Sequence, residues 1–323
     1  MAQILSLTQA AIVFGTVILF GAVGEILTEK SGNLNLGVPG IMYLGGIAGL
    51  GGAFIYEMSV DAPVPIVGLI IALLCALMAS VLAGFIYSFL TITLRANQNV
   101  TGLTLTIFGS GVANFLGGAM NKMAGGVGQI SVSATSGAYR ATLPFLSDVG
   151  VLSSLGFMVY LAIILAFIMS WFLRKTRKGL NLRAVGENPA TADAAGISVT
   201  KNKYLSTCIG AAITGLGGLY YVMDYIKGTW ANDGGIEKLG WLAVALVIFA
   251  RWKPRHAIWG SYLFGILFWL YFYIGGLTRS SQELFKMLPY IVTILVLIVV
   301  SMRRKHENQP PANLGQPYFR EDR

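Results

Sequence analysis

One uncharged run constrains this chain more than any other feature: residues 62–94 contain no Asp, Glu, Lys or Arg at 33 consecutive positions. About 20 apolar residues in a helix are enough to cross the hydrocarbon core of a bilayer. A straight helix over the whole run would be about 50 Å long, so we expect it to be tilted, kinked or to project from the membrane. The run therefore predicts an integral membrane protein.

Apolar stretches recur along the rest of the chain, where 55% of residues are hydrophobic and only 11% are charged. Soluble domains carry roughly 25% charged residues, which argues against a secreted enzyme, a nucleic-acid-binding domain or a disordered protein. We expect an all-α, polytopic helical membrane bundle with about eight to ten transmembrane helices, some of them interrupted or re-entrant. The expected spans are 8–28, 38–56, 63–94, 99–120, 150–173, 204–224, 256–274 and 287–302, with 239–250 as a short further span or half-span.

The basic residues orient these spans. If the chain crosses nine times with its N-terminus outside, the inside segments hold 17 of the 23 Lys and Arg residues. The positive-inside rule selects this orientation, and it explains the net charge of +9 without a nucleic-acid partner. We expect residues 1–302 to form one transmembrane domain, with segment 174–203 in the cytoplasm and 303–323 as a mobile cytoplasmic tail.

The cytoplasmic segment 174–203 contains the signature of a short helix. Asn188 suits the N-cap, Pro189 the first helical position and Gly196 the C-terminal stop. A helix of about seven residues is marginal alone, so it needs a surface to dock against. Such a helix between two spans lets a membrane subunit bind a soluble motor protein. The alternative is a solvated basic loop without a partner.

Residues 28–46 combine Gly32, Gly37, Gly40 and Pro39 with two asparagines, Asn33 and Asn35. Gly and Pro interrupt helices, and Asn side chains can satisfy the backbone groups that this frees. Irregular backbone of this kind lines the pathways of many transporters. The alternative is an interfacial loop that begins the next helix.

Few polar residues lie inside the expected spans. Asn114 is either an interhelical hydrogen-bonding residue or a substrate contact, and Asp224 lies near a span end. Tyr220 and Tyr221 precede Asp224; an interfacial aromatic belt is the favoured interpretation, and stacking on a ring-containing solute is the alternative. Gly109, Ala113 and Gly117, like Gly45 and Gly49, have the four-residue spacing that lets helices pack closely in lipid.

Several kinds of site have no sequence signature. The chain has no GxxxxGK[ST] phosphate-binding loop, no metal-spaced His or Cys cluster and no catalytic constellation, and Cys75 and Cys208 suit small core positions. An enzyme is therefore not expected. A membrane subunit of an ATP-driven transporter is favoured over an ion-coupled secondary carrier and over a channel, because the cytoplasmic helix suits a motor protein and charged mid-membrane groups are scarce.

Four motifs resemble a known family. Residues 179–199 (GLNLRAVGENPATADAAGISV) resemble the cytoplasmic coupling segment of ABC-importer permeases of the ribose, nucleoside and branched-chain amino-acid type. Residues 31–46, 210–225 and 234–265 resemble other motifs of that family, in the same order. The nucleoside-type members usually have Leu-Glu-Gly where Val38-Pro39-Gly40 stands here. Nucleosides and simple sugars are the implied solutes, with a flavin or another ring compound as the alternative.

The resemblance implies a bacterial plasma-membrane importer with four kinds of component. A solute-binding (lipo)protein delivers the solute, a second permease subunit completes the path, and a cytoplasmic ABC ATPase binds ATP and Mg²⁺, so that this chain itself holds no cofactor. The implied ATPase-coupling residues are Gly179, Arg183, Gly186, Glu187, Asn188, Pro189, Asp193 and Gly196. The implied substrate-path residues are Asn33, Asn35, Asn114, Tyr221 and Asp224.

Overall fold

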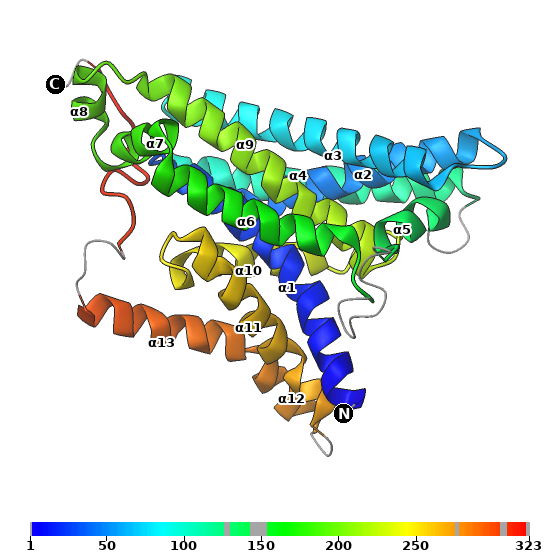
Figure 1. Cartoon of the computed structure of the whole chain (residues 1–323). Helices are drawn as coiled ribbons and strands as arrows, with labels where there is room; N and C mark the ends of the chain where they lie inside the picture. The colour runs from blue at the N-terminus through cyan, green and yellow to red at the C-terminus, as the bar shows by residue number, and fades with distance from the viewer. Residues whose placement is uncertain (1, 126–129, 143–153, 275–277, 304–308, 321–323) are drawn as a thin grey trace.

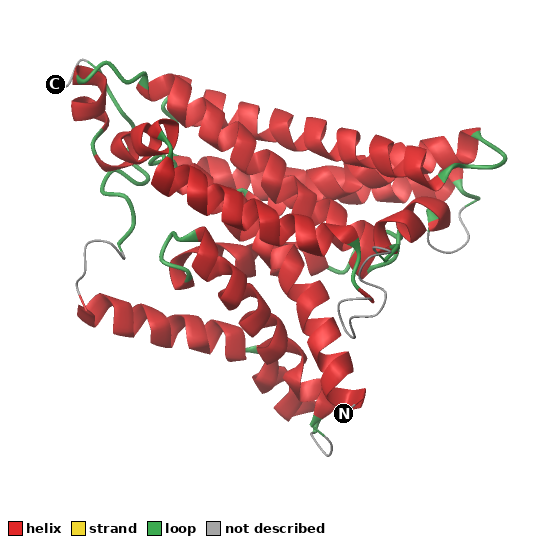
Figure 2. Cartoon of the chain, viewed as in Figure 1, coloured by secondary structure: helices red, strands yellow, loops and turns green. Residues whose placement is uncertain are grey.

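The computed structural model describes residues 2–125, 130–142, 154–274, 278–303 and 309–320. These residues are almost entirely helical (Figures 1 and 2) and contain no β-strand beyond two isolated bridges. The predicted all-α polytopic fold is therefore confirmed.

The helices follow the hydrophobic stretches of the sequence. In chain order they are α1 (Ala2–Glu29), α2 (Val38–Ser59), α3 (Pro65–Ser88), η1 (Phe89–Thr93), α4 (Gln98–Met123), α5 (Ser133–Arg140), α6 (Phe157–Lys175), α7 (Arg177–Glu187), α8 (Pro189–Ala194), α9 (Val199–Tyr220), η4 (Tyr221–Tyr225), α10 (Gly235–Phe249), α11 (Pro254–Tyr273), α12 (Arg279–Lys286) and α13 (Leu288–Arg303). The elements η1 and η4 are single π-helical turns that continue α3 and α9.

Six helices of the described part are long and apolar enough to cross a membrane. They are Gln3–Glu29, Val38–Ser59, Pro65–Thr93, Gln98–Met123, Phe157–Lys175 and Val199–Tyr225. Three further apolar helices, α10, α11 and α13, have 15, 20 and 16 residues and coincide with the last three expected spans. The higher number of crossings stays a prediction that depends on these three helices.

The uncharged run 62–94 does not form one straight α-helix. Its helix begins only at Pro65 and ends in the π-helical turn η1 at Thr93, which shortens it to 29 residues. Proline at the first helical position starts the helix because its missing N–H is not needed there. The helix is therefore shorter than the uncharged run, because it starts three residues later and ends in a wider π-helical turn.

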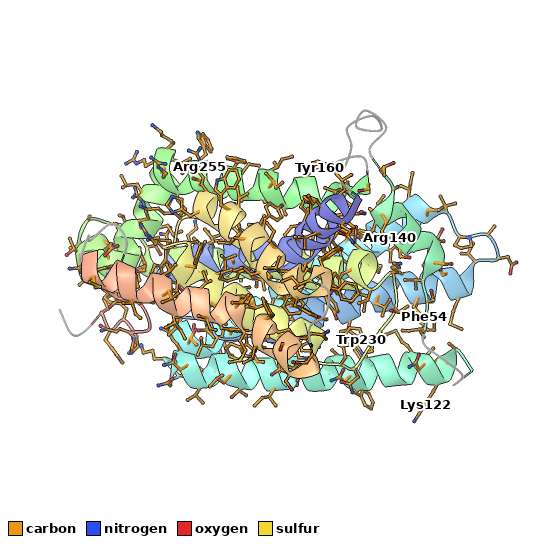
Figure 3. All side chains as sticks on the ribbon, turned by 90° about the horizontal axis from the view of Figure 1, so that it is seen from below. Phe54, Lys122, Arg140, Tyr160, Trp230 and Arg255 are labelled. Carbon is orange, nitrogen blue, oxygen red and sulfur yellow. The ribbon has the colours of Figure 1, made fainter. Side chains whose placement is uncertain are left out.

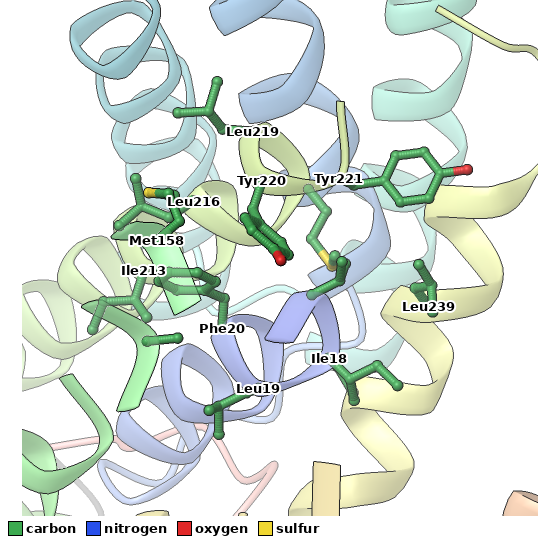
Figure 4. Close-up of a cluster of buried hydrophobic side chains, with 14 of the residues drawn as sticks. Ile18, Leu19, Phe20, Met158, Ile213, Leu216, Leu219, Tyr220, Tyr221 and Leu239 are labelled. Carbon is green, nitrogen blue, oxygen red and sulfur yellow. The ribbon is translucent and has the colours of Figure 1, made fainter. Parts of the chain in front are cut away.

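The centre of the bundle is made by α1, α2 and α9, whose residues are mostly buried, while α3, α4 and α6 expose apolar side chains on their outer faces. Figure 4 shows this core, where Phe20 of α1 lies beside Tyr220 and Leu216 of α9. The ring centroids of Phe20 and Tyr220 are 6.3 Å apart. An apolar outer face is expected where a helix contacts lipid.

Glycines allow the central helices to approach closely, as the small-residue spacing predicts. A Cβ atom at Gly109 of α4 would lie 2.5 Å from the carbonyl oxygen of Gly40 in α2, and one at Gly45 would lie 2.7 Å from the carbonyl oxygen of Gly215. Distances this short exclude a side chain. Gly109 and Gly45 therefore set the spacing of α2 from α4 and α9.

The bundle has two polar ends. Figure 1 shows α7, α8 and the C-terminus at one end of the long helices and α5 at the other. In the perpendicular view of Figure 3, Arg255 lies toward the α7–α8 end and Arg140 toward the α5 end. We call these the coupling end and the α5 end.

Candidate functional site

The predicted cap, helix and stop at 188–196 are confirmed. The side-chain oxygen of Asn188 accepts a hydrogen bond from the Thr191 N–H at 2.9 Å, and Pro189 is the first residue of α8. Gly196 has φ +80°, and the Ile197 N–H reaches back to the Ala192 carbonyl at 3.0 Å. A left-handed glycine with this bond is a common way to end a helix.

The helix α7, which precedes α8, has a low intrinsic helix propensity because Gly179 and Gly186 lie within it. Both glycines are explained by packing. A Cβ atom at Gly179 would collide with the Phe172 carbonyl of α6, and one at Gly186 would collide with the Lys30 carbonyl after α1. The two glycines thus allow α7 to pack directly against the ends of α6 and α1. This packing fixes the position from which α8 begins.

Residues 309–320, the described part of the C-terminal tail beyond α13, pack onto α7 and α8, whereas the sequence predicts a mobile segment. The Asn313 N–H donates to the Gly186 carbonyl at 3.0 Å, and the Ala312 N–H donates to Glu187 Oε2 at 3.2 Å. Asp193 Oδ2 accepts from the Tyr318 hydroxyl at 3.0 Å and lies 3.1 Å from Arg320 Nε. The tail therefore forms hydrogen bonds or ion pairs with Gly186, Glu187 and Asp193, three of the residues predicted to contact an ATPase.

Aromatic contacts complete this docking. Tyr318 packs against a small apolar cluster of Val185, Ala192 and Val199, and the Arg95 guanidinium lies 4.4 Å from the centroid of the Phe319 ring. The tail sequence is rich in Pro, Asn and Gln and has no apolar period, which is why its docking was missed. Its contacts are made by backbone N–H groups and a few isolated side chains.

The loop between α1 and α2 is buried and irregular, as the Gly, Pro and Asn residues predict. The Asn35 N–H donates to Glu25 Oε1 at 3.0 Å, and the Gly37 N–H donates to Asn35 Oδ1 at 2.9 Å. Asn33 Nδ2 donates to Thr207 Oγ1 of α9 at 3.1 Å. The Asn35 side chain thus serves the loop itself, whereas Asn33 lines a cavity at the coupling end.

Two buried carboxylates of α1, Glu25 and Glu29, accept hydrogen bonds at the same end of the bundle. Glu29 accepts a hydrogen bond from the indole N–H of Trp252, in the turn between α10 and α11. The next residue, Lys30, lies near Glu187; burial lowers the pKa of the Lys30 ammonium, and the Glu187 carboxylate opposes that shift. Sequence reasoning missed Glu29 and Trp252 because their partnership spans 223 positions.

A second cavity, of about 740 Å³, opens at the α5 end. Asp224, Tyr225 and Trp269 line it together with Arg140, which is labelled in Figure 3. Asp224 Oδ2 and the Trp269 Nε1 are buried and have no hydrogen-bond partner in the described part of the chain. We call this space the outer cavity. Its volume is in the range of small-molecule sites.

The predicted path residues are distributed over the length of the bundle and do not form one cluster. Asn33 and Asn35 lie at the coupling end, and Asn114 is half-buried along α4 with its Oδ1 atom unpartnered among the described residues. Tyr221 is 3% exposed, so it is not part of a lipid-facing aromatic belt. Its ring stacks on Tyr225 at a centroid distance of 5.2 Å, behind the wall of the outer cavity.

Comparison with known proteins gives a consistent family assignment. Residues 7–297 match the family model described as branched-chain amino acid transport system / permease component. A putative glucose ABC transporter permease of Haloferax volcanii is 30% identical, and a guanosine ABC transporter permease of Bacillus subtilis is 32% identical, each over 98% of both chains. A nucleoside ABC transporter permease of Lactococcus lactis subsp. cremoris is 28% identical over 88% of this chain and 89% of its own. No solved structure gives a significant match.

Proposed function

The chain belongs to the family of branched-chain amino acid transport system permease components and is a multi-pass ABC transporter permease, and we propose that it forms the import path for a nucleoside. The observation that carries the choice of solute is the outer cavity. The Oδ2 atom of Asp224 has no hydrogen-bond partner among the described residues, so it suits the N–H and O–H donors of a nucleoside. Tyr225 and Trp269 offer rings on which a base can stack.

A simple sugar is the second candidate. Aromatic rings beside a carboxylate also suit a sugar, whose hydroxyl groups donate hydrogen bonds, and one relative is named for glucose. A flavin, with a larger ring system, is the third solute to be compared. An ion-coupled carrier is set aside because the relatives are named as ABC transporter permeases.

The coupling end faces the cytoplasm in this proposal, because most of the Lys and Arg residues then lie inside. The segment 179–196, with Arg183, Glu187 and Asp193, docks a separate ATPase, which binds ATP and Mg²⁺ and performs the hydrolysis. A solute-binding protein delivers the solute at the α5 end, and a second permease subunit completes the path. The rigid contacts of α7 with α1 and α6 support this division, because they join the docking helices to the membrane helices.

Uptake by the reconstituted complex tests the proposal. The chain is reconstituted into proteoliposomes with its ATPase, its second permease subunit and its binding protein, and uptake of guanosine, glucose and riboflavin is compared with and without ATP. We expect ATP-dependent uptake of guanosine. Asp224→Asn should lower it at least about tenfold, as expected for loss of a charged hydrogen-bond acceptor.

The matched control is Asp61→Asn, which removes an exposed carboxylate from the loop between α2 and α3, on the same side as α5. It should transport like the parent protein. Preferred uptake of glucose or riboflavin would replace nucleoside as the solute. Uptake that persists without the ATPase would overturn the proposed coupling.

A further inference from the structure

A polar cavity of about 420 Å³ lies at the coupling end, away from the outer cavity. It is bounded by the loop after α1, the end of η1, the start of α9 and the docked tail. Three cations line it, Arg95, Lys203 and Arg320, against one carboxylate, Asp193. Asp193 binds Tyr318 and Arg320, and the lining cations exceed the lining carboxylates by two.

Lys203 is the residue that most needs a ligand. It is 3% exposed, and no hydrogen bond or ion pair is made by its ammonium group within the described ranges. A buried charge is costly unless it is paired and hydrogen-bonded. An anion in this cavity would pair with Lys203 and offset that cost.

The start of α9 adds a second feature that favours an anion. Ser198, Val199 and Thr200 line the cavity, and α9 continues for 22 residues from Val199. The first N–H groups of a helix have no intrahelical acceptor, and the helix dipole places partial positive charge there. Lys203 follows one turn later, so both charges act on the same space.

Asn33 indicates what else the ligand carries. It is 1% exposed, its Nδ2 group donates to Thr207, and its Oδ1 atom has no donor in the described part of the chain. An inorganic anion without hydrogen satisfies Lys203 alone. An anion that also bears hydroxyl or N–H groups satisfies both residues.

We infer that this cavity is a binding site for a phosphate monoester, such as a nucleoside monophosphate, at the coupling end of the permease. The phosphoryl group pairs with Lys203 and the start of α9, and a hydroxyl or N–H group of the ester donates to Asn33. The choice of a nucleoside ester rests on the proposed function, but the anion site does not. The product of intracellular phosphorylation of the solute would then be sensed where the ATPase docks.

Direct binding to the purified full-length chain tests the site without transport. The protein in phosphatidylcholine nanodiscs is titrated calorimetrically with guanosine monophosphate, inorganic phosphate and guanosine. We expect the monophosphate to bind more tightly than phosphate. Lys203→Gln should weaken the monophosphate at least about tenfold, as expected for loss of a charge-assisted hydrogen bond.

Lys201→Gln is the matched control, because Lys201 is exposed on the same helix two residues away and does not line the cavity. If Lys203→Gln does not fold, Asn33→Asp supplies a carboxylate to the cavity at nearly constant volume and should also weaken binding. Equal binding by the Lys201 and Lys203 variants, or no binding of either anion by the parent protein, overturns the inference.

A second set of nanodiscs containing phosphatidylglycerol separates two sources of the phosphoryl group. Phosphatidylglycerol carries a phosphate diester, so competition by this lipid that is lost in Lys203→Gln would overturn the monoester assignment and place a lipid headgroup at the site. Binding of guanosine as tight as its monophosphate overturns the site's anion preference. These binding experiments do not measure uptake. A negative result would therefore overturn the anion site and leave the proposal of nucleoside import untouched.

Discussion

Removal of the N-cap of α8 is the sharpest test of the coupling segment. Asn188→Ala deletes the oxygen that accepts the Thr191 N–H at 2.9 Å. Loss of such a cap costs about 1 kcal/mol, within a range of roughly 0.5–2 kcal/mol. A free-energy change of about 1 kcal/mol alters an equilibrium constant about fivefold. Because α8 has only six residues, it is not stable as an isolated helix.

We expect the affinity for the ATPase to fall about two- to fivefold, because apparent affinity falls with the population of the binding-competent form. Fivefold is the limit for a cap that contributes about 1 kcal/mol. The lower value applies if packing holds α8 in place. Pro189 and Ala192 are buried, and Ala192 contacts Val185 and Val199, so the helix does not depend on its cap alone. The membrane helices should be unaffected, since Asn188 is exposed at the surface.

The assay is a titration of the ATPase onto the permease in nanodiscs, with thermal unfolding of the permease measured in parallel. Asn188→Ser is the matched control, because serine provides an oxygen at the same position and is an equally good N-cap. Equal affinity of the Ala and Ser variants would refute the role assigned to α8 in docking. A large fall in melting temperature of the Ala variant would show that the segment stabilises the bundle instead.

Three further changes test the packing and the tail. Gly109→Leu puts a side chain where a Cβ already lies 2.5 Å from the Gly40 carbonyl oxygen, so monodisperse protein should be lost in size-exclusion chromatography; Gly111→Leu, with open space at its Cβ, should elute normally. Trp252→Phe leaves the buried Glu29 without its donor, at a cost of about 1–3 kcal/mol; an unchanged melting temperature would contradict this. Deletion of 309–323 should accelerate proteolysis within α7 and α8 several-fold, and an unchanged digestion rate would show that tail docking gives no protection.

Local patterns predicted the features that depend on neighbouring residues. The cap at Asn188 and the stop at Gly196 are defined by residues within one turn, so the sequence contains the whole signal. The close approach of Gly109 was predictable because small residues repeat on one helix face. The helix α7 was harder to predict because Gly179 and Gly186 are explained only by the carbonyl groups that they contact.

Long-range partnerships could not be predicted from a single sequence. Glu29 and Trp252 are 223 positions apart, and the tail reaches Asp193 across 125 positions. Asn33 and Asp224, both expected on one path, lie at opposite ends of the bundle because Asn33 follows α1 and Asp224 lies in η4, after α9. Their types suggest polar sites, but only the packing of α1 against α9 determines which end each occupies.

The helix α9 is the physical connection between those two ends. It begins one turn before Lys203 at the coupling end, and its continuation η4 presents Asp224 to the outer cavity. Its 22 residues span about 33 Å, and glycines bring its backbone against α1, α2 and α3. A close-packed helix transmits displacement because its neighbours cannot deform continuously. If α8 docks the ATPase as proposed, we expect movement imposed on α8 to be carried along α9 toward Asp224. The single π-helical turn η4, a form often found at functional sites, lies beside the outer cavity.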